Sequence, residues 1–552
     1  MNTADALATG LALHDTLTTL FRTQVGRLKR QLEARGPLAA QLDTAQVVSY
    51  EFAFINAELH AMRAMLRYGE ACLAQGAADL ETGMALVFAA DALPKLRARF
   101  ERIRFATGAS GEEYLSVFEQ PSALAFCAHH GSPEALEAVG RGLLAAGHCG
   151  RSLLPEDKQI IAASFARVAE EVVLPRAEEI HREDLTIPDE VLGAIADMGC
   201  FALSVPERFG GTAPDGGHDN LSMVVVTEEL SRGSLAAAGS PLTRPEIMTR
   251  ALLAGGHEAQ MAQWLPGIAQ GQPLCAIAVT EPDCGSDVAA VRLKATKVAG
   301  GWRLNGAKTW CTFAGKAGLL LVLARTDPDP AAAHRGLSLF LLEKPSTDDK
   351  AFEVRQPEGG VLTGKAIPTI GYRGMHSYTL FFDNVFVPAE NMVGGPEAEG
   401  KGFYQTMAGF AGGRLQTAAR ACGVMRAAFD AAARYAQERS VFGRRLADYQ
   451  LTAAKLAVLG AMLRACQEMT YHVASLMDAG KGQMEASLVK LYACRAAEHV
   501  TREALQIHGG MGYSEETAVS RYFVDARVLS IFEGAEETLA LKVVARELIL
   551  NA

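Results

Sequence analysis

Apolar residues recur at helical spacing throughout the first 150 residues. In "ELHAMRAMLRYGEACLAQ" (58–75) and "SPEALEAVGRGLLAAG" (132–147), apolar side chains follow one another at intervals of three and four, with charged side chains opposite. This pattern predicts helices that bury one face. A glycine-rich joint (147–159) follows, in which Pro155, Glu156 and Asp157 are typical of the first turn of a new helix.

The helical pattern continues to residue 272, interrupted by the Gly/Pro-rich loop "VPERFGGTAPDGGHDN" (205–220). Between 273 and 393 the period shortens. Eight short runs rich in Val, Leu, Phe and Trp are separated by turn residues: "LCAIAVTE", "VRLKATKV", "WRLNG", "KTWCTF", "LLLVLAR", "LSLFLLEK", "FEVRQ" and "SYTLFFDNVFV". They predict an antiparallel barrel or sandwich.

Long helical patterns return after residue 393, and the runs 403–436, 449–478 and 482–508 are each long enough for a bundle helix. The sequence therefore predicts an α+β protein. Its four predicted segments are an N-terminal helical extension (1–150), a helical domain (151–272), a β domain (273–393) and a C-terminal helical bundle (394–552).

Composition narrows the class of protein. The chain has 552 residues, of which 49% are apolar and 21% charged, which is typical of globular domains and excludes disorder. The net charge of -10 comes without a basic cluster, so we expect no nucleic-acid partner.

Cysteine usage and hydropathy bear on location. The ten cysteines form neither a C-x-x-C pair nor a Cys/His metal pattern, so we predict reduced thiols, no metal and a cytoplasmic protein. The first residues lack a basic signal-peptide region, and no apolar run approaches the roughly 18 residues of a membrane span. We therefore expect no membrane partner.

Five short words stand in a fixed order: "AVTEPDCGSD" (278–287), "NGAKTWCT" (305–312), "ERSVFGRRLADYQ" (438–450), "QIHGGMGY" (506–513) and "IFEG" (531–534). With these words, the chain from Pro155 onward resembles the acyl-CoA dehydrogenase family. The resemblance implies a helical domain, a β domain and a helical bundle, with FAD held between the β domain and the bundle. It also implies an acyl-CoA substrate.

In the β segment the resemblance places the flavin and its pyrophosphate against Ala278, Thr280, Gly285 and Ser286, with Ser286 also near the substrate. Short hydroxyls and backbone N–H groups suit such oxygens, although "EPDCGSD" also fits an ordinary β-turn. Trp310 and Thr312 alternate along a strand and are predicted to share one side. The resemblance puts both beside the flavin ring; a strand Trp is otherwise a core residue.

Two bundle segments resemble the parts that reach the FAD of a neighbouring subunit. The first supplies Arg439, Phe442 and Gln450, and a guanidinium suits phosphate oxygens. The second supplies Gln506, Gly509 and Gly510, where adjacent glycines allow a close backbone approach. A solvated helix end and a helix C-cap are the alternatives. The resemblance implies a homo-oligomer of at least two subunits.

Glu533 lies between Ile531-Phe532 and Gly534, and by itself it could be a solvated glutamate beside a turn glycine. The resemblance makes it the general base that removes the α proton of the thioester, with apolar walls raising its pKa. Gly534 then lets the carboxylate and its N–H face the substrate. Relatives with the base on a bundle helix carry it before the residue matching Arg414, but here Gly413 stands there. Arg414 could steady the base loop.

Three departures from the family pattern stand out. Ala535-Glu536 replaces a usual Thr-Ser, "FAGGR" (410–414) replaces a stretch with an acidic residue, and the first 150 residues have no counterpart. The small residues at 410–414 could make room for a branched acyl chain or mark a helix distortion. One subgroup shares the departures, and its members oxidise a short branched acyl-CoA that ends in a carboxylate. We nominate Arg244 as partner of that carboxylate, ahead of Arg373 and His376; a surface arginine is the alternative.

Three functions remain open at this stage. The first is a dehydrogenase that passes electrons to an electron-transferring flavoprotein. The second is an oxidase of similar fold, and the third is a flavin-binding protein without catalysis. The extension could be an interaction module, a cap over the active site or, as we favour, a substitute for a subunit contact.

Overall fold

The computed structural model describes residues 2–552, which form two compact units. Unit 1 comprises residues 2–159, 417–476 and 480–552, and unit 2 comprises residues 160–416 and 477–479. Unit 1 is thus assembled from both ends of the chain, and nearly all of unit 2 is inserted between them.

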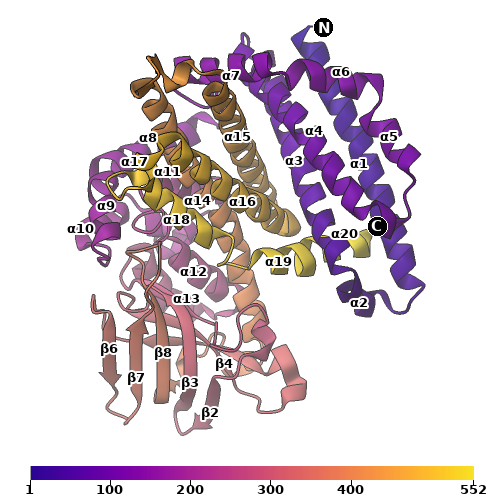
Figure 1. Cartoon of the computed structure of the whole chain (residues 1–552). Coiled ribbons are helices and arrows are strands. Elements are labelled where there is room, and N and C mark those ends of the chain that lie inside the picture. The colour runs from indigo at the N-terminus through magenta and orange to yellow at the C-terminus, as the bar shows by residue number, and fades with distance from the viewer. Residues whose placement is uncertain (1) are drawn as a thin grey trace. The chain divides into compact units, whose positions relative to one another are not determined.

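The extension is helical throughout, as predicted. Its helices are α1 (Thr3–Glu33), α2 (Leu38–Gln41), α3 (Gln46–Ala74), α4 (Asp79–Thr107), α5 (Gly111–Phe118), α6 (Pro121–His130) and α7 (Pro133–Ala146). The long helices α1, α3 and α4 lie side by side (indigo to purple in Figure 1). Local signals set the ends: α7 begins with the Ser132 side chain accepting from the Ala135 N–H and ends at Gly147 in the left-handed region.

The C-terminal segment forms the predicted long helices. They are α14 (Gly402–Glu438), α15 (Gln450–Asp478) and α16 (Gln483–His508), followed by the shorter α17 (Gly510–Tyr513), α18 (Ala518–Leu529), α19 (Glu536–Thr538) and α20 (Arg546–Asn551). A π-helical stretch, Leu539–Ala545, joins α19 to α20. Between α14 and α15 lies a two-stranded hairpin of β9 (Ser440–Val441) and β10 (Arg444–Arg445).

The extension and the bundle share one core. Ala53, Phe54 and Ala57 of α3 pack in a single buried cluster with Leu488 and Leu491 of α16 and with Ala540 and Val544 near the C-terminus. At a second point, Arg464 of α15 donates to the carbonyl oxygens of Cys149 and Gly150, both at 2.9 Å. The apolar faces predicted for residues 1–150 are therefore buried against the chain's own bundle.

Unit 2 combines helices with a sheet. Its helices are most of α8 (Glu156–Val168), then α9 (Leu174–Arg182), α10 (Asp189–Asp197), α11 (Asn220–Gly233), α12 (Thr243–Gly255) and α13 (Glu258–Ala269). Its strands are β1 (Cys275–Ala278), β2 (Lys294–Val298), β3 (Gly301–Thr312), β4 (Leu319–Arg325), β5 (Leu337–Glu343), β6 (Ala351–Arg355), β7 (Val361–Ala366) and β8 (Ser377–Pro388).

The strands form one sheet in the order β1-β4-β2-β3-β8-β7-β6, with β5 paired to β4. Most pairs are antiparallel, and β1 pairs with β4 in parallel. Two predicted strands, "WRLNG" and "KTWCTF", are one continuous strand, β3, with register shifts against β8. Strand β7 was not among the predicted runs.

Alternation along β4 divides the unit 2 core into two layers. Leu319, Leu321 and Leu323 face a cluster built with α12 and α13, whereas Leu320 and Val322 face a second cluster that includes residues of β3 and β8. The sheet is therefore buried on both faces at β4, whereas β2 and the far strands β7 and β6 carry exposed residues.

Two general properties of the described residues concern disulfide bonds and membrane crossing. None of the ten cysteines forms a disulfide in the described residues, and nine of them are buried. Among residues 2–552 no helix combines the length and the apolar character that a membrane crossing requires.

Candidate active site

Glu533 lies at the apex of a tight loop between α18 and α19, and its backbone is in the left-handed region (φ 54°). Gly534 follows with φ 99°. The loop is closed by the Glu536 N–H, which donates to the Ser530 carbonyl at 3.1 Å. A residue with a Cβ pays about 1–3 kcal/mol for such a backbone, so the surrounding structure must hold it there.

Residues of α16 stabilise the loop in this conformation. Lys490 is 1% exposed, and its Nζ donates to the carbonyl oxygens of Phe532 at 2.7 Å and Gly534 at 2.5 Å. The Ser530 hydroxyl donates to Glu498 of the same helix. Partly buried hydrogen bonds to the carbonyl groups of the residues before and after Glu533 keep this residue in its strained conformation.

The Glu533 carboxylate is dry and has a charged neighbour. Its side chain is 5% exposed, whereas the residue as a whole is partly exposed, so the exposed atoms belong to the main chain. The fully buried Arg420 of α14 places Nη2 3.9 Å from Glu533 Oε1, with its guanidinium 4.8 Å from the Phe532 ring centroid. The expected apolar walls are therefore only part of the environment. Arg414, proposed to steady this loop, belongs to unit 2 and keeps that role only as a prediction.

The turn after β1, which carries Thr280, Gly285 and Ser286, is fixed by a buried ion pair. Lys308 is 0% exposed and places Nζ 2.8 Å from Glu281 Oε1 and 2.8 Å from the Val279 carbonyl oxygen. The Glu281 carboxylate also accepts from the backbone N–H groups of Arg292 and Leu293, both at 2.7 Å. Burial lowers the pKa of the Lys308 ammonium below its usual value, and the nearby Glu281 charge offsets only part of that shift. Neither residue was singled out from the sequence, although both stand inside its motifs.

The predicted site residues on this turn differ in how far they are exposed. Ala278 is fully buried, so only its backbone can face a ligand, whereas Gly285 and Ser286 are exposed and Thr280 is half-buried. The Thr280 carbonyl accepts from the Thr309 N–H at 2.9 Å. Backbone and hydroxyl groups of this turn are thus presented beside the edge of β3.

Trp310 breaks the regular strand. Its φ is 56°, its side chain is among the exposed large apolar groups at 55%, and the β3–β8 register shifts between Lys308 and Cys311. Thr312 is buried, and its hydroxyl is 2.9 Å from the Ser377 hydroxyl. The prediction that Trp310 and Thr312 share a side assumed strict alternation, and the left-handed residue interrupts it.

The hairpin places Phe442 at its turn, with φ 51° and 97% exposure, and Arg439, immediately before the hairpin in sequence, is also exposed. Gln450 begins α15, and its amide donates to Glu137 of α7 at 3.0 Å. Gln506, Gly509 and Gly510 are exposed at the end of α16, and a Cβ added at either glycine would meet no atom within 4 Å.

These features fit FAD. An exposed indole, an exposed phenyl ring, an exposed arginine and open glycine backbone offer stacking surfaces, a phosphate partner and close approach. Of the eight non-glycine residues with positive φ in residues 2–552, three are Trp310, Phe442 and Glu533. Strained backbone concentrates at functional sites, and the assignment of these three residues to the site stays a prediction.

On the substrate side, the arginines differ in their surroundings. Arg244 of α12 is 6% exposed, so the alternative of a surface arginine is wrong. Arg373 donates to the His181 carbonyl at 3.0 Å, and His376 places Nε2 3.0 Å from Asp184 Oδ1. Both weaker candidates are engaged by their own unit.

Close packing explains why position 412 in "FAGGR" is a glycine. Glu246 and Arg250 form a buried ion pair at 2.7 Å, and a Cβ at Gly412 would lie 2.4 and 2.5 Å from their side chains. The α14 helix runs through this stretch without a break. Gly412 therefore accommodates the pair, and no helix distortion is present.

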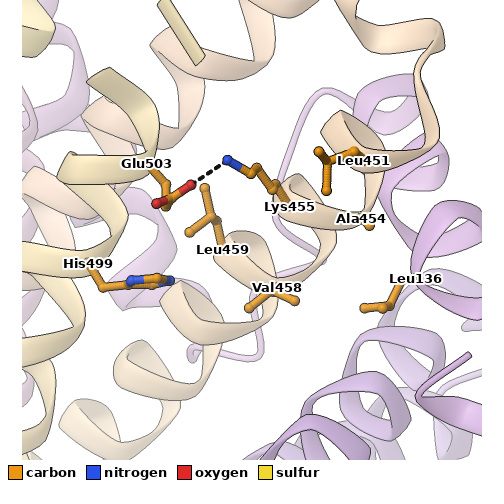
Figure 2. A pocket seen from close by; sticks show the side chains of 8 residues that line it. All are labelled: Leu136, Leu451, Ala454, Lys455, Val458, Leu459, His499 and Glu503. Carbon is orange, nitrogen blue, oxygen red and sulfur yellow. Dashed lines mark hydrogen bonds and ion pairs between the residues drawn. The ribbon is translucent and has the colours of Figure 1, made fainter. Parts of the chain in front are cut away.

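A surface groove of about 420 Å³ lies elsewhere in unit 1 (Figure 2). It is lined by Leu136, Leu451, Ala454, Lys455, Val458, Leu459, His499 and Glu503. Lys455 and Glu503 form an ion pair at 2.7 Å across it. None of the predicted site residues lines this groove.

The fold and the family comparison define a flavin-dependent oxidoreductase of acyl thioesters, and the chain belongs to the acyl-CoA dehydrogenase family. It matches the N-terminal domain of acyl-CoA dehydrogenase over residues 155–272, the middle domain over 276–385 and the C-terminal domain over 400–549. It is an enzyme with FAD as cofactor.

Three relatives illustrate the similarity. (2S)-Methylsuccinyl-CoA dehydrogenase of Cereibacter sphaeroides is 37% identical over 544 residues, 96% of each chain. The solved butyryl-CoA dehydrogenase of Megasphaera elsdenii is 31% identical with a TM-score of 0.65, covering 72% of this chain and 99% of its own. A glutaryl-CoA dehydrogenase of Mycobacterium smegmatis in complex with FADH2 is 26% identical with a TM-score of 0.62, covering 72% and 95%.

Proposed function

We propose that this chain oxidises a short branched acyl-CoA that ends in a carboxylate, with (2S)-methylsuccinyl-CoA as substrate and mesaconyl-CoA as product. The observation that carries the proposal is the extent of similarity. The Cereibacter enzyme of that name matches 96% of this chain, whereas the solved butyryl-CoA dehydrogenase matches 72%. A match over 96% of this chain includes most of the extension, whereas the shorter relative is matched over 99% of its own length and leaves 28% of this chain uncovered.

Glu533 is the proposed base. Its dry carboxylate accepts the proton from the carbon next to the thioester carbonyl, and the loop contacts fix where that carboxylate points. Its exposed main chain, followed by Gly534, supplies an N–H to the thioester oxygen, where one such donor is worth about 3 kcal/mol. FAD, when bound, takes up the hydride from the β carbon.

The residues proposed to hold FAD are Ala278, Thr280, Gly285, Ser286, Trp310 and Thr312 together with Arg439, Phe442, Gln450, Gln506, Gly509 and Gly510. The proposed substrate residues are Ser286, Arg244, Arg414 and Gly534. Exposure of Phe442, Arg439 and both glycines on the surface of one chain supports their use by a second copy. We therefore propose a homo-oligomer of at least two subunits.

Arg244 is the proposed partner of the distal carboxylate. A buried guanidinium offers a bidentate site for a carboxylate in a low-dielectric setting. The competing cations Arg373 and His376 lie against the His181 carbonyl and Asp184. We expect Arg244→Ala to remove the preference for carboxylated over plain acyl-CoA, and Arg373→Ala to leave the preference unchanged.

The proposal extends to electron transfer and cellular role. An electron-transferring flavoprotein is the proposed acceptor, in the cytoplasm, within the ethylmalonyl-CoA route of acetate assimilation. Ten cysteines without a disulfide are consistent with a reducing compartment. Rapid reoxidation of the product-bound reduced enzyme by air would instead indicate an oxidase.

The deciding experiment is anaerobic bleaching of the flavin by a panel of CoA thioesters: (2S)-methylsuccinyl-, butyryl-, isobutyryl- and glutaryl-CoA. We expect fastest bleaching with (2S)-methylsuccinyl-CoA and none with any thioester in Glu533→Gln. Equal or faster bleaching by butyryl-CoA would refute the substrate assignment. Full turnover by Glu533→Gln would refute the base.

A further inference from the structure

The N-terminal extension contacts the loop that carries Glu533 through one hydroxyl group. Tyr50, near the start of α3, donates from Oη to Glu536 Oε1 at 2.5 Å. Glu536 begins α19 and closes the loop through its N–H bond to the Ser530 carbonyl. The position of Glu536 therefore determines how the loop closes around Glu533.

Arg495 of α16 completes this cluster. Its Nη2 donates to Tyr50 Oη at 2.7 Å and to Glu536 Oε1 at 2.5 Å, and its Nε donates to Glu536 Oε2 at 3.2 Å. Its guanidinium lies 4.1 Å from the ring centroid of Phe54, one turn along α3 from Tyr50. The Glu536 side chain is 14% exposed, so three donor atoms hold it largely out of water.

The cluster accounts for one departure from the family pattern. The departure is at Ala535-Glu536, and the carboxylate at 536 accepts hydrogen bonds from Tyr50 and Arg495. A chain without the extension would have no partner at the place of Tyr50. The departure in the loop and the added helices are thus two halves of one contact.

We propose that Tyr50 is a positioning residue of the base loop: its hydroxyl fixes Glu536 and thereby the direction of the Glu533 carboxylate. The inference rests on the proposed role of Glu533. Lys490 and Glu498 hold the loop from the bundle side, and Tyr50 holds it from the extension side. Residues 1–150 thereby contribute to proton abstraction, and Tyr50 does so through Glu536.

The hydroxyl stays a donor at working pH. Burial, together with the hydrogen bond to Glu536, raises the pKa of Tyr50 to about 12, although the Arg495 charge opposes the shift. The Tyr50 hydroxyl therefore keeps its proton up to moderately alkaline solution. Any pH dependence of the reaction in that range comes from other groups.

The test is Tyr50→Phe, which removes the hydroxyl and keeps the ring beside Phe54. We expect single-turnover flavin reduction to slow about tenfold, because a misdirected base loses rate without losing binding. Half-saturation by substrate and FAD content should stay unchanged, and the pH profile of reduction should shift. In a Glu536→Ala background, Tyr50→Phe should have no further effect.

Tyr68→Phe is the matched control. Tyr68 lies on the same helix, and its buried hydroxyl donates to the Arg151 carbonyl at 2.8 Å. This variant should reduce flavin at the wild-type rate. Equal slowing in both variants, or an unchanged rate and pH profile in Tyr50→Phe, would overturn the positioning role.

Glu533→Gln separates the two proposals. If Glu533→Gln stops reduction while Tyr50→Phe keeps the full rate, the base is correct and the role of Tyr50 is wrong. If Glu533→Gln reduces flavin normally, the proposed base itself is wrong.

Discussion

Lys490 spans Glu533: its buried ammonium donates to the carbonyl oxygens of the residues immediately before and after it, at 2.7 and 2.5 Å. The lysine therefore binds the main chain on both sides of the proposed base. It fixes the main chain at the residue before and at the residue after the one that carries the carboxylate.

Lys490→Met should lower the free energy of unfolding by about 2 kcal/mol, since two partly buried carbonyl groups lose a charged donor. Flavin reduction should slow at least tenfold as the loop loosens. Lys455→Met is the control: this lysine is 33% exposed in its ion pair with Glu503, so we expect a loss of at most about 1 kcal/mol. Denaturant titration and single-turnover kinetics measure both effects; a full rate in Lys490→Met would contradict the expectation.

Gly534→Ala should destabilise the protein by about 1–3 kcal/mol, because φ is 99° and the new Cβ would lie 2.8 Å from the buried Leu539 side chain. Gly480→Ala carries the same kind of backbone (φ 71°) with no atom within 4 Å. It should cost about 1 kcal/mol and leave turnover intact. Comparable loss of turnover in both would show that the loop geometry at 534 is unimportant.

Lys308→Met should destabilise unit 2 by about 3–5 kcal/mol, because the Glu281 carboxylate would remain buried without its counter-ion. FAD content should fall with it, since Glu281 fixes the turn. Adding Glu281→Gln should restore part of the stability by removing the buried charge. Thermal unfolding with flavin quantification tests this, and a double variant less stable than the single one would refute the argument.

Asp184→Asn tests the pH dependence of unit 2. Burial would raise the pKa of Asp184, but hydrogen bonds from Lys350 and His376 hold it below its usual value. The depressed pKa contributes stability that is present above the unfolded-state pKa and is lost as pH falls through the folded-state value.

The Asn variant tolerates the left-handed backbone of this position (φ 51°). It should therefore be about 1 kcal/mol less stable at neutral pH, with the difference vanishing in acid. A difference that persists undiminished at the lowest pH would contradict the linkage. Acyl-CoA preference should not change, since Asp184 and not substrate engages His376.

Phe442→Ala should weaken FAD retention at least tenfold, because a 97% exposed ring has no packing role in its own chain. Phe105→Ala is the control: this ring is 82% exposed on α4 and belongs to no predicted site. Gel filtration of both variants reports retained flavin and mass. Normal retention by Phe442→Ala would refute a cross-subunit role for the hairpin.

The long helices of the C-terminal segment were predictable because apolar periodicity over 26 or more residues is hard to imitate by chance. Strand β7, "VLTGKA", was missed because Gly364 and Lys365 disguise its alternation. Gly306, with φ 137°, suggested a turn where β3 only changes register. Pairing with β8 decides both cases, and a linear pattern does not show which strand is the neighbour.

The proposed base was found from its neighbours in sequence, and its supports were not. Arg420 and Lys490 stand on long helices where a buried cation looks like any other interior position. They meet Glu533 across 113 and 43 residues of chain, respectively. Tertiary contact alone assigns them to the site, whereas Glu281 and Lys308 could have been noticed within their own motifs.

The shared core of α3 with α16 and the C-terminal helices bears on synthesis. Phe54 leaves the ribosome more than 430 residues before Leu488 and Val544 exist to cover it. Unit 2 can complete its contacts while the first helices still wait with an apolar face uncovered. The extension is therefore translated first but is among the last parts of the protein to complete its packing. We expect nascent chains to need protection by holding chaperones until translation is almost finished.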